Sequence, residues 1–228
     1  MAQLRKTVLG KVSGTVGDIV FRERDGMNYL STRPNSFMPG IDPASVARRQ
    51  RFALTSKASV SINMIPELKI LWSTAAPSGV SSYNYIFKIN YPFLSLMGVS
   101  NLLKIVPDNG FGITLTEHTV SNTSVHAVIS PIGIKTGINT VIETSLKMIC
   151  VEFLSNPIDE SVGAYSLVSL VSTEMPITLT NPVTFDADLT SQQSLLFDKY
   201  QDYKVFIALV SVDSQGKPIH HSSSVLLT

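Results

Sequence analysis

The order of apolar and polar side chains in residues 8–33 predicts a β-hairpin. The segment alternates through Val12, Val16, Ile19 and Phe21, which is typical of a strand that is buried on one side. Asp25-Gly26 then has the composition of a tight hairpin turn, because glycine adopts the positive φ that such turns require. The residues after it, "MNYLSTRP", supply the second strand.

Three glycines in the first predicted strand, Gly10, Gly14 and Gly17, are unusual for a strand interior. Glycine weakens a strand unless another backbone comes close or the strand bends. We therefore expect this hairpin to be packed against another part of the structure or against a partner. Residues 1–40 are interpreted as a glycine-rich, basic β-hairpin arm.

Residues 41–100 predict a helical segment. Asp42 is a good N-cap and Pro43 fits the first helical position, so a helix is expected from there to about Asn63. A second short helix is expected to begin at Pro66, and a third to end near residue 90, before Pro92. We interpret the aromatic side chains of the third helix region, and Trp72, as core residues.

From residue 101 onward, short β-type runs alternate with turn residues. The longest runs are "TVIETSLKMICVEFL" and "DYKVFIALVSVD", and "LLKIV" at residues 102–106 is a shorter one. Seven or more strands at this spacing predict an antiparallel, immunoglobulin-like β-sandwich over residues 101–228. The predicted fold is therefore mainly β with a helical segment: the hairpin arm, two or three helices, and the sandwich, with a boundary near residue 100.

Composition favours a folded chain with extensive contacts. Hydrophobic residues make up 44% of the 228 residues and charged residues 15%, which excludes a disordered chain. A surface with few charges favours permanent contacts with other subunits. The single cysteine, Cys150, cannot form a disulfide within the chain and is interpreted as a buried thiol. We find no signal peptide and no apolar run of membrane-spanning length, so a soluble cytoplasmic protein without membrane contact is expected.

Charge is distributed unevenly along the chain. Residues 1–58 hold ten Lys or Arg and four acids, for a net charge of +6, and the remainder holds eight and thirteen, for −5. Arg48, Arg49 and Arg51 form a basic cluster near the start of the first helix, where cations oppose the helix dipole. This cluster is either a solvated face or a contact for an anionic partner. The basic residues 1–58 would suit contact either with nucleic acid or with the acidic remainder of a neighbouring copy.

No catalytic or metal-binding pattern emerges. The four histidines, at 118, 126, 220 and 221, lack Cys or acidic partners at zinc-ligand spacing. Asp186 and Asp188 share a strand face, but an acid–base pair needs further support. There is no phosphate loop and no nucleophile elbow. We therefore expect no cofactor, no metal and no enzymatic activity, although a hydrolase built from scattered residues stays open.

Several segments together resemble an uncharacterised family of Bacteroidota and their phages or prophages. The N-terminal "GKVSGTVGDIVFRERDGMNYLSTRP" is similar to that family's glycine-rich hairpin, and "RRQRFALTSK" to its following helix. "SSYNYIFKIN" resembles its middle segment and "DYKVFIALVSVDSQGKPIHHSSSVLLT" its closing hairpin. The last turn is longer here, and Gly17-Asp18 stands where Gly-Asn is usual. The resemblance implies a β-rich C-terminal half and no catalytic residues.

These observations favour a structural assembly protein, specifically a virion component of a phage or phage-like particle (head, neck or tail). Its partners would be other copies of itself or other virion proteins, in an oligomer made in the host cytoplasm and then built into the virion. A glycine-rich arm can add strands to the sheet edge of a neighbour. The alternatives are a nucleic-acid-binding module that uses the basic region and a carbohydrate-binding sandwich. The residues expected to make contacts are Gly10, Gly14, Gly17, Arg22, Arg24, Arg33, Arg48, Arg49 and Arg51.

Overall fold

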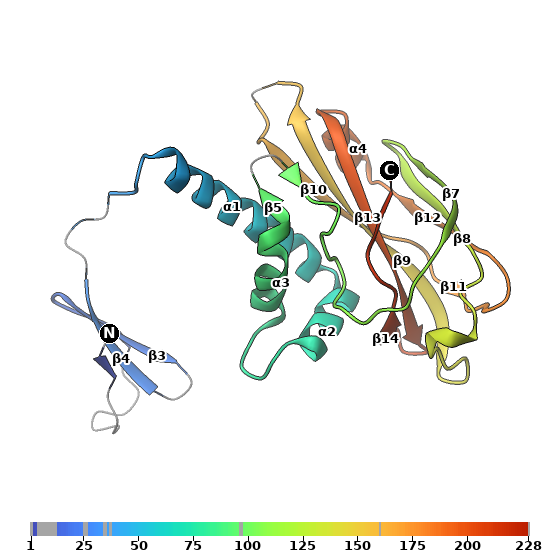
Figure 1. Cartoon of the computed structure of the whole chain (residues 1–228), viewed down its shortest axis with the longest axis horizontal. Helices are drawn as coiled ribbons and strands as arrows, with labels where there is room; N and C mark the ends of the chain where they lie inside the picture. Colours follow the sequence, from blue (N-terminus) through green and yellow to red (C-terminus); the bar gives the residue numbers. More distant parts are fainter. Residues whose placement is uncertain are drawn as a thin grey trace. The chain divides into compact units, whose positions relative to one another are not determined.

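The computed structural model describes residues 2–3, 13–24, 27–33, 36, 38–95, 98–159 and 161–227. The chain is mainly β, with several antiparallel sheets and, in the described part, four α-helices. It divides into two compact units, residues 1–45 and residues 46–228, which are described separately below (Figure 1).

The first unit contains a four-stranded antiparallel sheet with the order β1-β4-β3-β2. Its strands are β1 (Ala2–Gln3), β2 (Gly14–Val16), β3 (Ile19–Arg24) and β4 (Met27–Thr32). The predicted pairing of two strands on either side of residues 25–26 is confirmed, because Arg24 is opposite Met27. The turn residues Asp25 and Gly26 themselves lie outside the described residues.

The first predicted strand differs from the observed one. It is broken at Gly17-Asp18, where a tight turn joins β2 to β3 and places Val16 opposite Ile19. Gly17 has a φ of +58°, which a residue with a side chain rarely adopts. The alternation of apolar residues continues through this turn, so periodicity alone predicted one strand where the structure has two.

Three helices follow the N-terminal sheet, and their predicted limits are confirmed; the first begins in the last residues of the first unit and continues into the second. They are α1 (Pro43–Met64), α2 (Pro66–Ala75) and α3 (Ser82–Asn90), followed by a 3-10 turn, η1 (Tyr91–Phe93). Asp42 caps α1, since its Oδ1 accepts a hydrogen bond from the Ser45 N–H at 2.8 Å. A fourth helix, α4 (Ser191–Phe197), was not predicted. Thr190 and Gln193 form a capping box at its start, which is a signal the sequence contains.

The strands of the second unit form one large sheet and two small ones. The large sheet has the order β10-β9-β13-β14, with β11 also on β9 and β15 also on β13. These strands are β9 (Glu143–Pro157), β10 (Tyr165–Val171), β11 (Met175–Pro176), β13 (Tyr200–Asp213), β14 (Pro218–His221) and β15 (Val225–Leu227). A three-stranded sheet has the order β12-β8-β7. Its strands are β7 (Leu115–Val120), β8 (Ser124–Ile129) and β12 (Val183–Asp188). The remaining sheet has two strands, β5 (Leu94–Ser95) and β6 (Gly98–Val99).

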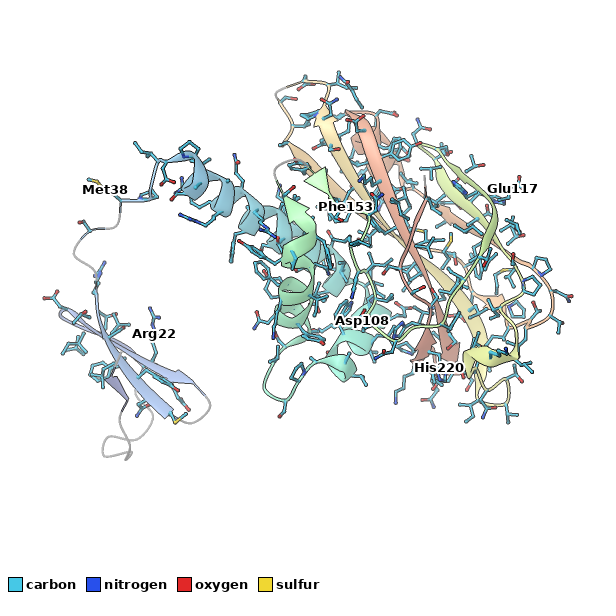
Figure 2. The ribbon with its side chains drawn as sticks, viewed as in Figure 1. Arg22, Met38, Asp108, Glu117, Phe153 and His220 are labelled. Carbon is cyan, nitrogen blue, oxygen red and sulfur yellow. The ribbon has the colours of Figure 1, made fainter. Side chains whose placement is uncertain are left out.

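The large sheet is covered on both faces (Figure 1). Ile149, Val151 and Phe153 of β9 pack in the same core as α1, α2 and α3, and Figure 2 shows Phe153 on that side. Met148 and Cys150 belong to a second core, shared with β8 and β12. Successive side chains of a strand point to opposite faces, so a strand covered on both sides becomes apolar throughout. This arrangement explains the unbroken runs "MICV" in β9 and "VFIALV" in β13, and Cys150 is buried as predicted.

An ion pair connects a helix to this sheet. Lys147 Nζ on β9 lies 2.8 Å from Glu67 Oε1 on α2 and 3.0 Å from Glu174 Oε1. The hydrogen bond with Glu67 raises the pKa of Lys147 above its ordinary value. Because Lys147 and Glu67 are both largely removed from solvent, this contact fixes where α2 begins on the sheet.

The predicted strand at residues 102–106 is wrong. Leu103, Ile105 and Val106 are buried, but the segment is a loop. Side chains, and not a neighbouring strand, make the hydrogen bonds of its backbone. The Trp72 indole N–H donates to the Ile105 carbonyl. The Asn90 side chain accepts from the Lys104 N–H and donates to the Lys104 carbonyl. Residues on both sides of the predicted boundary near residue 100 share one core.

Candidate functional site

The register of the N-terminal sheet gives it two chemically different faces. Phe21 lies opposite both Leu30 and Gly14, and Ile19 lies opposite Val16, so the apolar side chains share one face. Arg22 lies opposite Tyr29 on the other face, and Figure 2 labels Arg22. We call the face of Val16, Ile19, Phe21 and Leu30 the apolar face.

The apolar face is only partly covered within the described part of the sheet. Val16 is 69% exposed and Ile19 42%, while Phe21 and Leu30 are half-buried. Among residues 13–23 and 27–33, the buried side chain is Asn28, and it is polar. A sheet normally buries one apolar face against another layer. The exposed part of this face, at Val16 and Ile19, is therefore where this unit could contact a partner.

The glycines predicted to permit close approach have a conformational role in this chain. Gly14 has a φ of +123° and Gly17 a φ of +58°, and a Cβ atom at either position would meet nothing within 4 Å. The positive φ accounts for both residues, and among the described residues no atom lies where a side chain at either position would begin. Gly10 lies outside the described residues.

The predicted basic residues fall into different environments. Arg22 and Arg33 are exposed, and the Arg33 N–H donates to the Asp18 carbonyl at 2.6 Å. Arg24 is the last residue of β3. Arg48 and Arg49 are exposed on α1.

Arg51, by contrast, has an internal partner. Its Nε and Nη2 donate to the Tyr91 carbonyl at 2.8 and 2.6 Å, and its guanidinium carbon lies 4.2 Å from the centre of the Tyr91 ring. Arg51 therefore satisfies the carbonyl at the end of α3, and the structure accounts for it without an external anion.

A groove runs between α1 and β10 in the second unit. Two adjoining hollows of about 360 and 330 Å³ share Lys57 and Tyr165 in their walls. β10 is the outer strand of the large sheet, with β9 on its paired side. The groove thus lies along a sheet edge, where main-chain groups are available to a ligand.

A buried carboxylate organises the end of the large sheet where β9 begins. Glu143 is 1% exposed, and it accepts hydrogen bonds from the Asn139 N–H at 2.7 Å and from His220 Nδ1 at 3.0 Å. The Ser211 hydroxyl also donates to Glu143. Ser211 lies where the β13–β14 register shifts, and the His220 N–H donates to its hydroxyl.

The grouping of serine, glutamate and histidine does not form a nucleophilic triad. In a triad the serine hydroxyl bonds the imidazole, whereas here Ser211 and His220 Nδ1 both bond the carboxylate. The cluster joins the start of β9 to the β13–β14 hairpin. The sequence did not indicate it, because Glu143 and its two partners are 68 and 77 residues apart.

The other predicted polar residues lie on the three-stranded sheet. Asp186 accepts from His126 Nδ1 at 2.7 Å, and the two residues are directly opposite each other on β12 and β8. His118 is paired with Ala127, one position along from His126, so His118 and His126 project from opposite faces. The described residues contain no group of three or more potential metal ligands.

Glu152 is a buried carboxyl that the sequence analysis overlooked within the run "MICVEFL". It is fully buried on β9, on the face of the second core, and neither oxygen has a hydrogen-bond partner among the described residues. Burial raises the pKa of Glu152 to about 7. Its flanking register partners are Val168 and Val205, which offer no polar contact.

Comparison with known proteins does not assign this chain to a class of protein, so its class is inferred from the geometry described above. The chain matches no family model, and no curated protein is significantly similar to it. None of the helices in the described ranges has the length and apolar character needed to cross a bilayer.

Proposed function

We propose that this chain is a non-enzymatic structural protein that assembles with other copies of itself, or with other proteins of a particle, through its N-terminal sheet. The observation that carries the proposal is the apolar face of Val16, Ile19, Phe21 and Leu30, on which Val16 and Ile19 are exposed and no described residue is fully buried. Burying apolar surface is the main favourable term in association, at roughly 25 cal/mol per Å².

The small size of this sheet supports the same proposal. Isolated hairpins are marginal in water, and a few strands need a hydrophobic layer on one face to be stable. The described residues of the first unit supply no buried apolar side chain, whereas both hydrophobic cores lie in the second unit. Contact with a partner would supply the missing layer.

The particle we propose is a phage or phage-like virion, with the chain in its head, neck or tail. This part rests on the resemblance of the N-terminal, middle and closing segments to the Bacteroidota and phage family. The chain would be made in the host cytoplasm and then incorporated. We also propose that the second unit is an immunoglobulin-like sandwich, which is supported by two antiparallel sheets on either side of one core.

A nucleic-acid-binding function is the second candidate. The face opposite the apolar one pairs Arg22 with Tyr29, and Arg48 and Arg49 are exposed on α1. Arginine and aromatic side chains together suit a backbone phosphate and a stacked base. Binding of this kind falls steeply as salt rises, which distinguishes it from packing of apolar faces.

The proposal is tested by comparing the mass of the full chain with that of a chain lacking residues 1–40. The shortened chain keeps α1 and both cores, since every member of those cores follows Val46. We expect a defined oligomer for the full chain and a folded monomer for the shortened one. Oligomers of equal size from both chains would overturn the role of the N-terminal sheet.

A further inference from the structure

The α1–β10 groove has the form of a site for an extended strand. Its walls combine Ala53, Leu54 and Val60 of α1 with Tyr165 and Leu167 of β10, and Lys57 lies in both hollows. Extended segments bind beside a strand by main-chain hydrogen bonds, with pockets for alternate side chains. An edge strand with an apolar helical wall provides both.

The hydrogen-bond pattern fixes which groups of β10 point outward. The Ser172 N–H donates to the Met148 carbonyl on β9, so residues at even positions of β10 bond to β9. The odd positions, including Leu167, therefore direct their N–H and carbonyl away from β9. The Ser169 carbonyl agrees with this direction, because it accepts a hydrogen bond from the Gln193 side chain, so this outward group already has a partner.

The described lining of the groove includes one charged side chain. This residue is Lys57, and it is exposed. A ligand that combines an apolar side chain with a nearby carboxylate would fit this wall. Such a ligand would add a strand to β10 and place its acid at Lys57.

We infer that the groove binds β2 of a second copy of the chain, with Val16 on the apolar wall and Asp18 at Lys57. β2 is the outer strand of its own sheet, all three of its residues are exposed, and Asp18 follows it directly in the turn. Gly14 lacks a side chain, so that end of β2 can approach α1 closely. This inference rests on the proposed function and names the partner surface that the assembly would use.

Charge exchange between two full-length variants tests the contact. Asp18→Lys and Lys57→Glu each place like charges in the contact, and each is expected to weaken self-association roughly tenfold or more. An equimolar mixture of the two variants restores opposite charges between different chains. We therefore expect the mixture to assemble like the original protein. Lys69→Glu, the same change at an exposed lysine of α2, is the control and is expected to have no effect.

Each outcome of this experiment decides the inference. Restoration in the mixture supports a contact between copies. Restoration only when both substitutions are in one chain would overturn it in favour of a contact within a chain. If both variants assemble as well as the original, the groove is not the contact, while the proposed assembly stands. A monomeric original protein would overturn the proposed function as well.

Discussion

Phe21 of β3 and Leu30 of β4 lie directly opposite each other on the apolar face, and neither is buried. Cross-strand apolar pairs of this kind stabilise a sheet, and here both side chains stay partly accessible to solvent. This pair distinguishes the first unit from the second, where the long strands are covered on both faces.

A charge on the apolar face is expected to prevent assembly. Ile19→Asp places a carboxylate in the surface that the partner would bury, so the concentration for half-assembly should rise about tenfold or more. Val20→Asp introduces the same charge on the opposite face, at a half-buried position, and is the control for the effect of the charge alone. Light scattering over a concentration series measures both variants. Identical curves for the two would contradict the assignment of the contact to the apolar face.

Glu152 is expected to destabilise the protein at neutral and alkaline pH. Its pKa is about 7 in the folded chain against an ordinary value of 4.5, so the folded state holds its proton over that range while the unfolded state loses it. Stability should therefore fall as pH rises from 4.5 to about 7 and then level off. Glu152→Gln removes this dependence and should stabilise the fold at pH 8 by roughly 3 kcal/mol or less.

Denaturant unfolding between pH 4.5 and 8 measures this effect, with the exposed substitution Glu117→Gln as the control. Parallel stability–pH curves for the original protein and Glu152→Gln would show that Glu152 finds a partner or solvent in the folded chain.

Removing the buried Glu143 carboxylate is expected to weaken the sheet. Glu143→Ala leaves the Asn139 N–H, the Ser211 hydroxyl and His220 without their acceptor, and an unsatisfied buried group costs roughly 1–3 kcal/mol. Asp186→Ala breaks an exposed pair with His126 and should cost less than about 1 kcal/mol. Equal losses in thermal unfolding would contradict a special role for the Glu143 cluster.

Cys150 is expected to be unreactive in the folded chain. It is completely buried, and burial raises the pKa of its thiol, so little reactive thiolate is present. A thiol reagent at pH 8 should label it only in denaturant. Rapid labelling of the native protein would contradict the packing of the second core.

Salt separates the two proposed functions. Packing of apolar faces should change by only a few-fold between low and high ionic strength, whereas affinity for nucleic acid should fall by orders of magnitude. A gel-shift or anisotropy titration with DNA at two salt concentrations measures the second. Tight binding that depends steeply on salt and is lost in Arg22→Ala would favour the nucleic-acid function.

Local signals predicted the helices well. Asp42 with Pro43, and Pro66, mark helix starts through their own chemistry, so α1 and α2 begin where they were expected. The strand predicted at residues 102–106 is a buried loop. Its apolar side chains have the composition of a strand, but side chains from distant parts of the sequence make the hydrogen bonds of its backbone. Trp72 and Ser224, which bond Ile105, are not recognisable from the local sequence.

The candidate sites were less predictable than the fold. The two faces of the N-terminal sheet depend on register, and register depends on the Gly17-Asp18 turn, which the continuous alternation concealed. Glu143, Ser211 and His220 are brought together only by the pairing of β9, β13 and β14. The groove likewise requires α1 and β10, which are far apart in the sequence, to lie side by side.

The most direct test of the central claim is the absolute mass of the full-length chain over a range of concentrations, measured by light scattering at low and high salt. We predict a defined oligomer that persists at high salt and dissociates when the apolar face carries Ile19→Asp. A chain that stays monomeric at every concentration, with and without that substitution, would contradict it.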